Sequence, residues 1–428
     1  MKWRMRYLTM FVSALLLVAL SFVLWTSNQK KILRIEVYAG SSWDVPNSRE
    51  NRVLDNIIRQ FEKSYPNVKV VYESGIPKKD YDNWLAEKIL KGEQADVFMV
   101  PENDFSMLAS SGAFKSLDSL ISKEEAAAYY PVAYQAGQYQ GHSYALPIES
   151  NPVMMCVNKD LLEKEGISIP NSNWTLEDLY AICQKVTKDT DGDSLIDQYG
   201  ITDYTWKQAL VAYNGHLRNQ NGVNVDSVEM HQALSFISKL DSLNQRYKVT
   251  SNDFDEGKVA FYPMSLAQYR TYKPYPYHVA KYSRFSWTCI PMPAAKAGIP
   301  ATQVKTSLFA MSSKTKQDKL AWEFMKLLCQ NHKNQQELFA KSQGTSVLTS
   351  VVKSSQTKKI LQADDFGLDS LTSQRLDHMM KHSVLDISRD LDYHSLERLD
   401  YLLGNALKNN EIDSILPSIQ REMEETGK

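Results

Sequence analysis

The chain has 428 residues, of which 43% are hydrophobic and 23% charged, so it is long enough for two lobes and too apolar for a disordered protein. Its formal net charge is −1. This balance excludes the basic excess on which nucleic-acid binding depends, so we expect no nucleic-acid partner.

The N-terminal segment predicts export. Basic residues precede an uncharged, mostly apolar run at 7–25, which is the pattern of a signal peptide or a membrane anchor. The length of the run favours an uncleaved anchor within residues 1–32, and the basic residues before it favour an exported body. Small residues at Ala19 and Ser21 leave open cleavage near Ser21, and thus secretion.

The residues after the anchor alternate between strand and helix patterns. Period-two or continuous apolar runs predict strands at 33–37, 68–72 and 95–100, and apolar residues at helical spacing predict helices at 53–61 and 85–90. Strands that alternate with helices predict an α/β fold with a mainly parallel sheet.

Two interruptions divide the rest of the chain. Polar residues at 149–152 separate two strand-like runs and predict a first crossing between lobes, and a proline-punctuated stretch at 290–293 predicts the return. Strand and helix patterns after the return resume the first lobe, and the C-terminal residues are typical of helices. We therefore assign 33–148 plus 292–345 to lobe 1, and 152–288 plus 346–428, with the C-terminal helices, to lobe 2.

The cysteines carry no metal or redox signature. They are scattered, without a CxxC pair, so we expect buried thiols. One disulfide is the alternative, and no sequence signal selects which two cysteines would form it. The residues are Cys156, Cys183, Cys289 and Cys329.

Several short phrases recur in an order and at a spacing that resemble one known family. They include Ile57 to Glu62 with Tyr65 to Val68, Gly92-Glu93 with Asp96 to Phe98, Gly112 with Leu117-Asp118, Gly141 to Pro147, Asn158 to Leu161 leading through Gly166 and Pro170 to Trp174, Phe254 with Gly257 to Ala260, and Ala321 to Phe324. Over about residues 33–348, the chain resembles the family 1 extracellular solute-binding proteins of bacterial ABC transporters, which include maltose- and oligosaccharide-binding proteins. It departs from them at Gly344-Thr345-Ser346, where many members have Gly and Pro, and in lacking a lipid-attachment cysteine, since no cysteine precedes Cys156.

The resemblance implies a type II periplasmic-binding-protein fold, in which two α/β lobes close around a ligand. It also implies a monomer on the outer face of the cytoplasmic membrane that captures a carbohydrate-like solute and delivers it to ABC permease subunits. A membrane-anchored ligand sensor is the alternative. We find no GxSxG, HExxH or Walker A motif, so we expect no enzyme and no required cofactor. An extracytoplasmic glycosidase is a lesser alternative.

Ligands of open α/β sheets bind beyond the carboxyl ends of strands, where loops converge. Polar and aromatic residues at such places, or at the predicted crossings, are therefore candidate ligand contacts, although each is also compatible with an ordinary surface or packing role. They are Trp43, Asp44, Asn103, Asp104, Glu149, Asn151, Trp206, Tyr213, Asn214, Met264, Ser265 and Thr306.

One acidic loop resembles a calcium loop. Hard oxygen ligands could come from the carboxylates of Asp189, Asp191, Asp193 and Asp197 and from the Leu195 carbonyl. Ser194 and Gly200 replace the glycine and the glutamate of a full EF-hand loop. The loop is thus a candidate structural Ca²⁺ site, and a hydrated turn is the alternative.

Overall fold

The computed structural model describes residues 30–43, 50–220, 222–245, 247–272, 285–364, 370–409 and 411–426. The apolar run at 7–25, on which the predicted anchor depends, lies outside these ranges. Among the described residues, no helix combines the length and the apolar character that crossing a bilayer requires.

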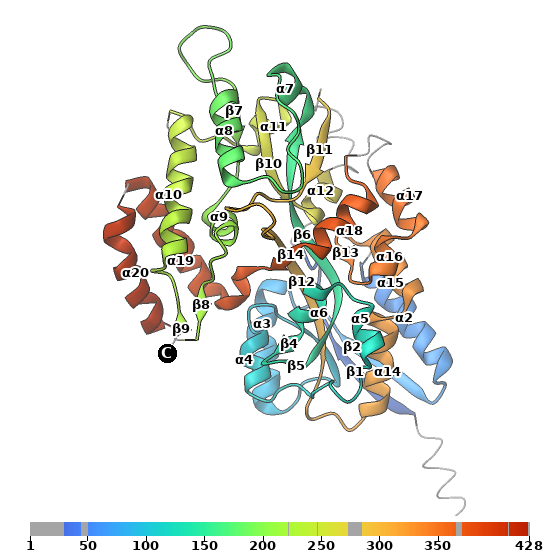
Figure 1. The fold of residues 1–428 in the computed structure, drawn as a ribbon. Helices are drawn as coiled ribbons and strands as arrows, with labels where there is room; N and C mark the ends of the chain where they lie inside the picture. The colour runs from blue at the N-terminus through green and yellow to red at the C-terminus, as the bar shows by residue number, and fades with distance from the viewer. Residues whose placement is uncertain are drawn as a thin grey trace, which may run out of the picture.

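The first lobe begins with parallel strands covered by helices (Figure 1). β1 pairs in parallel with β2 and β3, and apolar residues at helical spacing bury one face of α2. α3 ends at Gly92, whose positive φ of 69° lets its backbone N–H cap the helix. The elements are β1 (Lys31–Glu36), α2 (Glu50–Ser64), β2 (Val68–Glu73), α3 (Lys78–Lys91), β3 (Val97–Val100), α4 (Phe105–Ser110), α5 (Lys123–Ala127), α6 (Pro131–Ala136), β4 (Gln138–Tyr139) and β5 (His142–Ser143).

Two long strands carry the chain between the lobes. The first half of β6 (Ala145–Asn158) pairs antiparallel with β12 (Thr302–Met311), and its second half pairs antiparallel with β10 (Val259–Ser265) and β11 (Trp287–Ile290). β14 (Ser383–Leu385) lies parallel to the start of β12. Because β6 and β12 cross in opposite directions, the described strands form a mixed sheet, where the sequence predicted a mainly parallel one. Its central order is β2-β1-β3-β12-β6-β10-β7, with β7 at Tyr199–Ile201.

The second lobe surrounds the far half of β6. β7 pairs in parallel with β10, and Thr175 and Asp178 form the capping box that starts α8. The C-terminal helices α19 and α20 pack on each other and on α10 (Figure 1). The elements are α7 (Lys159–Lys164), α8 (Leu176–Val186), β7 (Tyr199–Ile201), α9 (Trp206–Ala212), β8 (Arg218–Asn219), β9 (Gly222–Val223), α10 (Val228–Leu243), α11 (Ser251–Asp255), α12 (Leu266–Tyr272), α19 (Tyr393–Asn409) and α20 (Ile412–Thr426).

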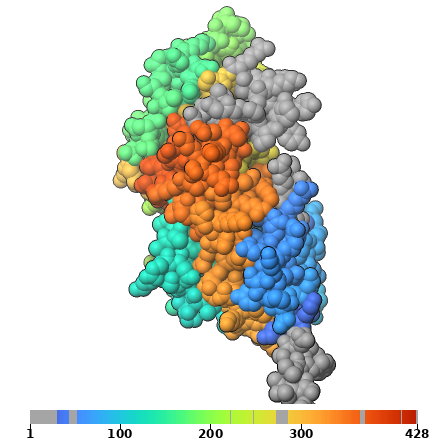
Figure 2. Space-filling view, turned by 90° about the vertical axis from the view of Figure 1, so that its right-hand side faces the viewer, coloured from blue at the N-terminus to red at the C-terminus, as the bar shows by residue number. Residues whose placement is uncertain are grey.

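The segment between β12 and α19 runs along one face of the molecule. Figure 2 shows it in orange, beside the blue N-terminal elements of the first lobe. Its elements are α14 (Asp318–Cys329), α15 (His332–Lys341), β13 (Thr345–Ser346), α16 (Thr349–Val352), α17 (Ser355–Asp364), α18 (Ser373–Lys381) and a short 3₁₀ helix, η1 (Ile387–Asp390).

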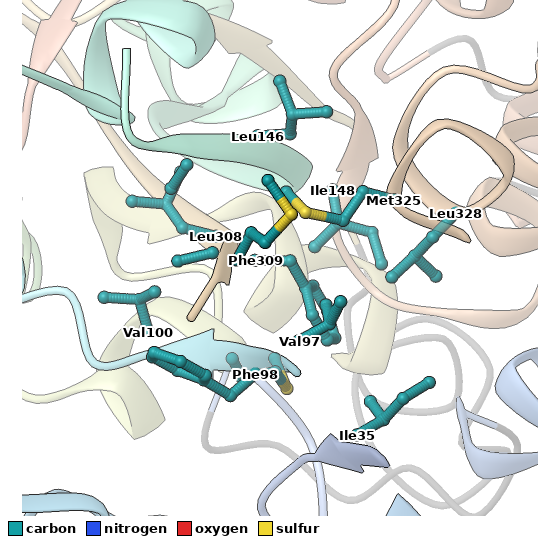
Figure 3. Packing of buried hydrophobic residues seen from close by; sticks show 14 of the residues in the cluster. Ile35, Val97, Phe98, Val100, Leu146, Ile148, Leu308, Phe309, Met325 and Leu328 are labelled. Carbon is teal, nitrogen blue, oxygen red and sulfur yellow. The ribbon is translucent and has the colours of Figure 1, made fainter. Parts of the chain in front are cut away.

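Separate apolar cores hold the two lobes. In the first, side chains of the strands, such as Ile35 and Phe309, pack with Met325 and Leu328 of α14 (Figure 3). The second joins β6 and β10 to α8, α9, α10, α19 and α20. It also contains Met292, Ala294 and Ala301, so the chain returns at β12 and not at the predicted 292. A third core joins α16 and α18 to α6 and to the far half of β6.

Candidate functional site

A cleft of about 910 Å³ lies between the lobes, within the size range of ligand-binding sites. From the first lobe it is lined by the loop after β1, by α3, by the turn after β3 and by the middle of β12. From the second lobe it is lined by the start of α9 and by the η1–α19 segment. The turns after β1 and β3 follow the carboxyl ends of parallel strands, as expected for a ligand site in an α/β fold.

Four predicted residues line this cleft: Trp43, Asn103, Asp104 and Thr306. Trp43 is only 8% exposed, so it offers a small part of its ring to the cleft. Thr306 is held by a hydrogen bond of 2.9 Å between its Oγ1 and the Oγ of Ser150 on the neighbouring strand. Asp44 lies outside the described residues.

Glu149 and Asn151 lie in the crossing part of β6, but not in the cleft lining. The Glu149 carboxylate accepts hydrogen bonds from the Ser342 hydroxyl and, at 2.8 Å, from the Gly344 N–H. Burial raises the pKa of Glu149, and these hydrogen bonds oppose the rise. Asn151 Oδ1 accepts from the Ala267 N–H at 2.9 Å and so caps the start of α12. Both side chains therefore hydrogen-bond β6 to neighbouring parts of the chain at the crossing, and neither lines the cleft.

The predicted residues of the second lobe also lie outside the lining. Trp206 is buried, and its indole N–H donates to Asp400 at 2.8 Å. Tyr213 packs partly buried against the second core, while Asn214 is exposed with a positive φ of 59°. Met264 is fully buried in the third core. Ser265 precedes α12, where its hydroxyl accepts from the Gln268 N–H.

The cleft contains side chains that the sequence did not predict. Some are sequence neighbours of predicted residues, as Glu102 is of Asn103 and Lys305 is of Thr306. The position of the predicted residues was therefore a sequence signal for their neighbours too. Others are on helices distant in sequence, and no local signal separates them from ordinary polar surface. The additional residues include Lys78, Asp82, Asn83, Glu102, Lys207, Lys305, Asp392, Tyr393, His394, Glu397 and Asp400.

The pKa values of two carboxyl groups in the cleft are raised strongly. Burial raises the pKa of Glu102 to about 7, although the charges of Lys305 and Arg389 oppose the rise. Burial, together with the negative charge of Asp104, raises the pKa of Asp82 to about 6. The first-lobe wall therefore holds carboxylates that are poorly solvated.

The acidic loop lies between α8 and β7, away from the cleft lining. Carboxylate oxygens of Asp189, Asp191 and Asp197 lie within 4.8 Å of one another, close enough to share one cation. Asp189 accepts backbone hydrogen bonds that lower its pKa, including 2.7 Å bonds from Gly192 and Ser194. The Asp193 carboxylate accepts from the Leu195 N–H at 2.8 Å and is not part of this group.

Two α/β lobes, joined by crossing strands and separated by a polar cleft, define a protein that captures a ligand between its lobes. The family described as bacterial extracellular solute-binding protein matches residues 56–364, and the chain belongs to this family. The family and the fold are those of binding proteins and not of enzymes.

The chain is similar to several known proteins at low sequence identity. The maltotriose-binding protein of Pyrococcus abyssi is 25% identical over 138 residues, which are 32% of this chain and 30% of the relative. The chain thus spans about a third of the length of the first curated relatives that it matches. MalE, the sugar-binding protein of Xanthomonas citri, has a TM-score of 0.74 at 15% identity, covering 92% of this chain and 97% of that one. The cyclic α-maltosyl-1,6-maltose binding protein of Arthrobacter globiformis has a TM-score of 0.71 at 14% identity, over 92% and 98%. These structures share the two-lobed fold.

Proposed function

We propose that the protein is the extracytoplasmic solute-binding subunit of an ABC importer, which captures a sugar or oligosaccharide in the cleft and delivers it to permease subunits. The observation that carries the proposal is the polar cleft between two lobes, in a chain that belongs to a solute-binding family. Several relatives are named for binding maltose-like glycans, which supports a carbohydrate ligand.

The cleft chemistry suits a ligand with many hydroxyl groups. Carboxylates, amides and hydroxyls can accept hydrogen bonds from sugar hydroxyls, and aromatic faces can pack against the apolar side of a sugar ring. Trp43 and Tyr393 supply aromatic faces, and Asn103, Asp104 and Thr306 supply polar groups.

Calorimetry of the full chain with a panel of neutral, amino and acidic oligosaccharides tests this proposal. We expect at least one glycan to bind saturably and to raise the Tm, because a ligand that binds only the folded state stabilises it. Tyr393→Ala should weaken binding by about 0.5–1.5 kcal/mol if the ring packs on the sugar. Tyr401→Ala is the matched control, since Tyr401 is on the same helix and similarly exposed, at 62% against 55%, but outside the cleft lining. The carbohydrate assignment fails if no glycan binds.

We propose that the chain works as a monomer, held at the membrane by residues 7–25 unless it is cleaved near Ser21. The length of the apolar run supports an anchor, and so does the lack of an upstream cysteine for lipid attachment. Mass spectrometry of the mature N-terminus distinguishes anchor from signal peptide. An anchored ligand sensor is the second candidate, favoured by the same run. Loss of solute uptake in a deletion strain identifies an importer, whereas unchanged uptake with a lost transcriptional response identifies a sensor.

We also propose a structural Ca²⁺ at the acidic loop, supported by the convergence of the Asp189, Asp191 and Asp197 oxygens. The expected result is calcium binding by calorimetry that Asp191→Ala abolishes, with little response to Mg²⁺. Identical blank traces for the wild type and the variant would leave the loop as a hydrated turn.

A further inference from the structure

The charged side chains on the second-lobe wall of the cleft already have partners within the protein. Lys207 Nζ and Asp400 Oδ2 form an ion pair of 2.7 Å, and the Tyr393 hydroxyl donates to Glu397 at 2.7 Å. Asp392 accepts from the Ser395 N–H at 3.0 Å at the start of α19. A ligand would have to compete with these contacts.

Three carboxyl groups on the opposite wall differ. Asp82, Glu102 and Asp104, which we call the acidic wall, line the cleft from α3 and from the turn after β3. Among the described residues, the side-chain carboxylates of Asp82 and Asp104 make no hydrogen bond and no ion pair. Glu102 Oε1 is shielded from solvent and accepts no hydrogen bond from any residue that the structure describes. A buried acceptor without a donor is costly, so Glu102 Oε1 lacks a donor that a ligand can bring, and the half-buried carboxylates of Asp82 and Asp104 can accept from the same ligand.

The cleft also concentrates negative charge. Seven carboxyl and four lysine side chains line it, a formal net charge of −3 where the whole chain carries a formal net charge of −1. One of the lysines, Lys207, is held by Asp400, and Lys78 donates to the Ser42 carbonyl at 2.8 Å. Burial, together with the negative charge of Asp392, raises the pKa of Asp104. A confined site of one sign favours ligands of the other.

We propose that the acidic wall binds the ammonium group of an amino sugar, so that the cleft prefers glycans with a protonated amine over neutral and anionic glycans of the same size. An ammonium group supplies three donors and a positive charge, which satisfies the acceptors and relieves the repulsion between the carboxylates. A hydroxyl supplies one donor and no charge, and a uronate adds repulsion. This inference rests on the proposed carbohydrate function and specifies its ligand class.

Calorimetry with four oligosaccharides of equal length tests the inference. The probes are a glucosamine oligomer, its N-acetylated form, a glucose oligomer with the same linkage, and a galacturonate oligomer, each with the full chain at a pH where the amine is protonated. N-acetylation removes the charge and keeps the ring. We expect the amine form to bind at least about tenfold more tightly than the acetylated form, the scale of a charge-assisted hydrogen bond, and the galacturonate to bind most weakly.

Asp82→Asn combined with Asp104→Asn should abolish this preference, so that the amine form and its acetylated form bind with similar affinity. Because neither carboxylate is hydrogen-bonded or ion-paired within the part of the chain that the structure describes, the double variant should fold and keep or slightly raise the Tm, which scanning calorimetry checks. Glu87→Gln is the control for loss of a negative charge on α3, since Glu87 is outside the cleft and pairs with Lys91.

The outcomes separate the two proposals. If neutral glycans bind as tightly as the amine form, or if the double variant weakens both equally, the ammonium assignment is overturned and carbohydrate capture stands. If none of the four probes nor any other glycan binds, both are overturned.

Discussion

Glu149 lies at the first crossing with its carboxylate against the backbone of Gly344. A Cβ atom at position 344 would be 2.5 Å from Glu149 Oε1 and 2.6 Å from its Cδ. The carboxylate cannot move aside freely, because it is buried and hydrogen-bonded to Ser342 and to the Gly344 N–H. The glycine is therefore required by close approach.

This contact makes the first prediction. Gly344→Ala should lower the free energy of unfolding by about 1–3 kcal/mol, the usual cost of overpacking. Gly404→Ala is the control: this glycine is exposed within α19 and a Cβ there meets nothing within 4 Å. It should stabilise the protein by about 0.5–1 kcal/mol, because alanine restricts the unfolded chain. Urea denaturation measures both changes. Equal changes in the free energy of unfolding for the two variants would contradict a requirement for glycine at position 344.

Individual residues also show how far the sequence could locate the site. Trp43 and Asn103 were predicted because they follow strands, and that local signal places a residue at an edge of the sheet. Asp392 and Tyr393 had no such signal, since their position depends on how the C-terminal helices pack on α10. Asn151 was predicted in the right segment, but its side chain caps a helix, which only the partner Ala267 reveals.

At the level of elements, His231 joins α10 to α20. Its two ring nitrogens each lie 2.9 Å from a carboxylate oxygen, one of Asp226 and one of Asp413 at the start of α20. Both nitrogens can donate only if the ring is protonated. Burial lowers the pKa of His231, but the two hydrogen bonds outweigh it and the pKa is raised.

We therefore expect the α10–α20 contact to weaken with rising pH. Because the folded pKa of His231 is above the unfolded value, the stabilisation is complete below the unfolded pKa of about 6.5 and is lost as pH rises through the folded pKa. The effect should stay below about 1 kcal/mol, since the pairs are accessible to solvent. Urea unfolding of the wild type and of His231→Gln, below and above these pKa values, measures the change in the free energy of unfolding. If the two proteins show parallel pH profiles, the contacts of His231 with Asp226 and Asp413 do not stabilise the fold in a pH-dependent way.

β6 and β11 bring two cysteines face to face. Cys156 and Cys289 are directly opposite in the ladder with their sulfur atoms 3.7 Å apart, and both are thiols in the structure. The Cys289 N–H donates to the Ser370 carbonyl and not across the ladder. In antiparallel pairs that exchange no backbone hydrogen bonds the Cα atoms are about 4.5 Å apart, within the disulfide range.

Refolding with glutathione disulfide should thus oxidise this pair alone. Two exchange steps would link Cys156 to Cys289 and release two molecules of reduced glutathione, while Cys183 and Cys329 stay reduced. Peptide mapping by mass spectrometry identifies the bond, and Cys289→Ser is the control that should remove it. A bond to either remaining cysteine would refute the predicted pairing.

The elements of the first lobe were largely predictable, whereas the return crossing was not. Periodicity predicted the strands and helices from 33 to 100, because each signal is local. The prolines at Pro291 and Pro293 suggested a lobe boundary, yet Met292 packs in the second core and the chain crosses only at β12. The position of a crossing depends on which core each strand joins. An apolar strand has the same sequence pattern whether it packs in the core of the first lobe or of the second.

At the scale of the whole molecule, β6, β12 and the segment at β14 join the first and second cores, and the third core packs beside the far half of β6. Because the first and second cores are separate, we expect the lobes to change their angle while each core stays packed. The cleft walls come from both lobes, and a ligand that touches α3 and α19 together favours the closed arrangement over the open one. Its apparent affinity then includes the free energy of closure.

A bound glycan should therefore reduce the radius of gyration of the protein in small-angle scattering and raise its free energy of unfolding by about 2.7 kcal/mol at a ligand concentration of 100 times Kd. Tyr393→Ala removes a contact from the second-lobe wall only, so glycan that still binds to the first lobe should produce less compaction at equal occupancy. Tyr401→Ala should compact as the wild type does. An unchanged radius at saturation would mean that the ligand enters an arrangement already closed, and stabilisation would then occur without compaction.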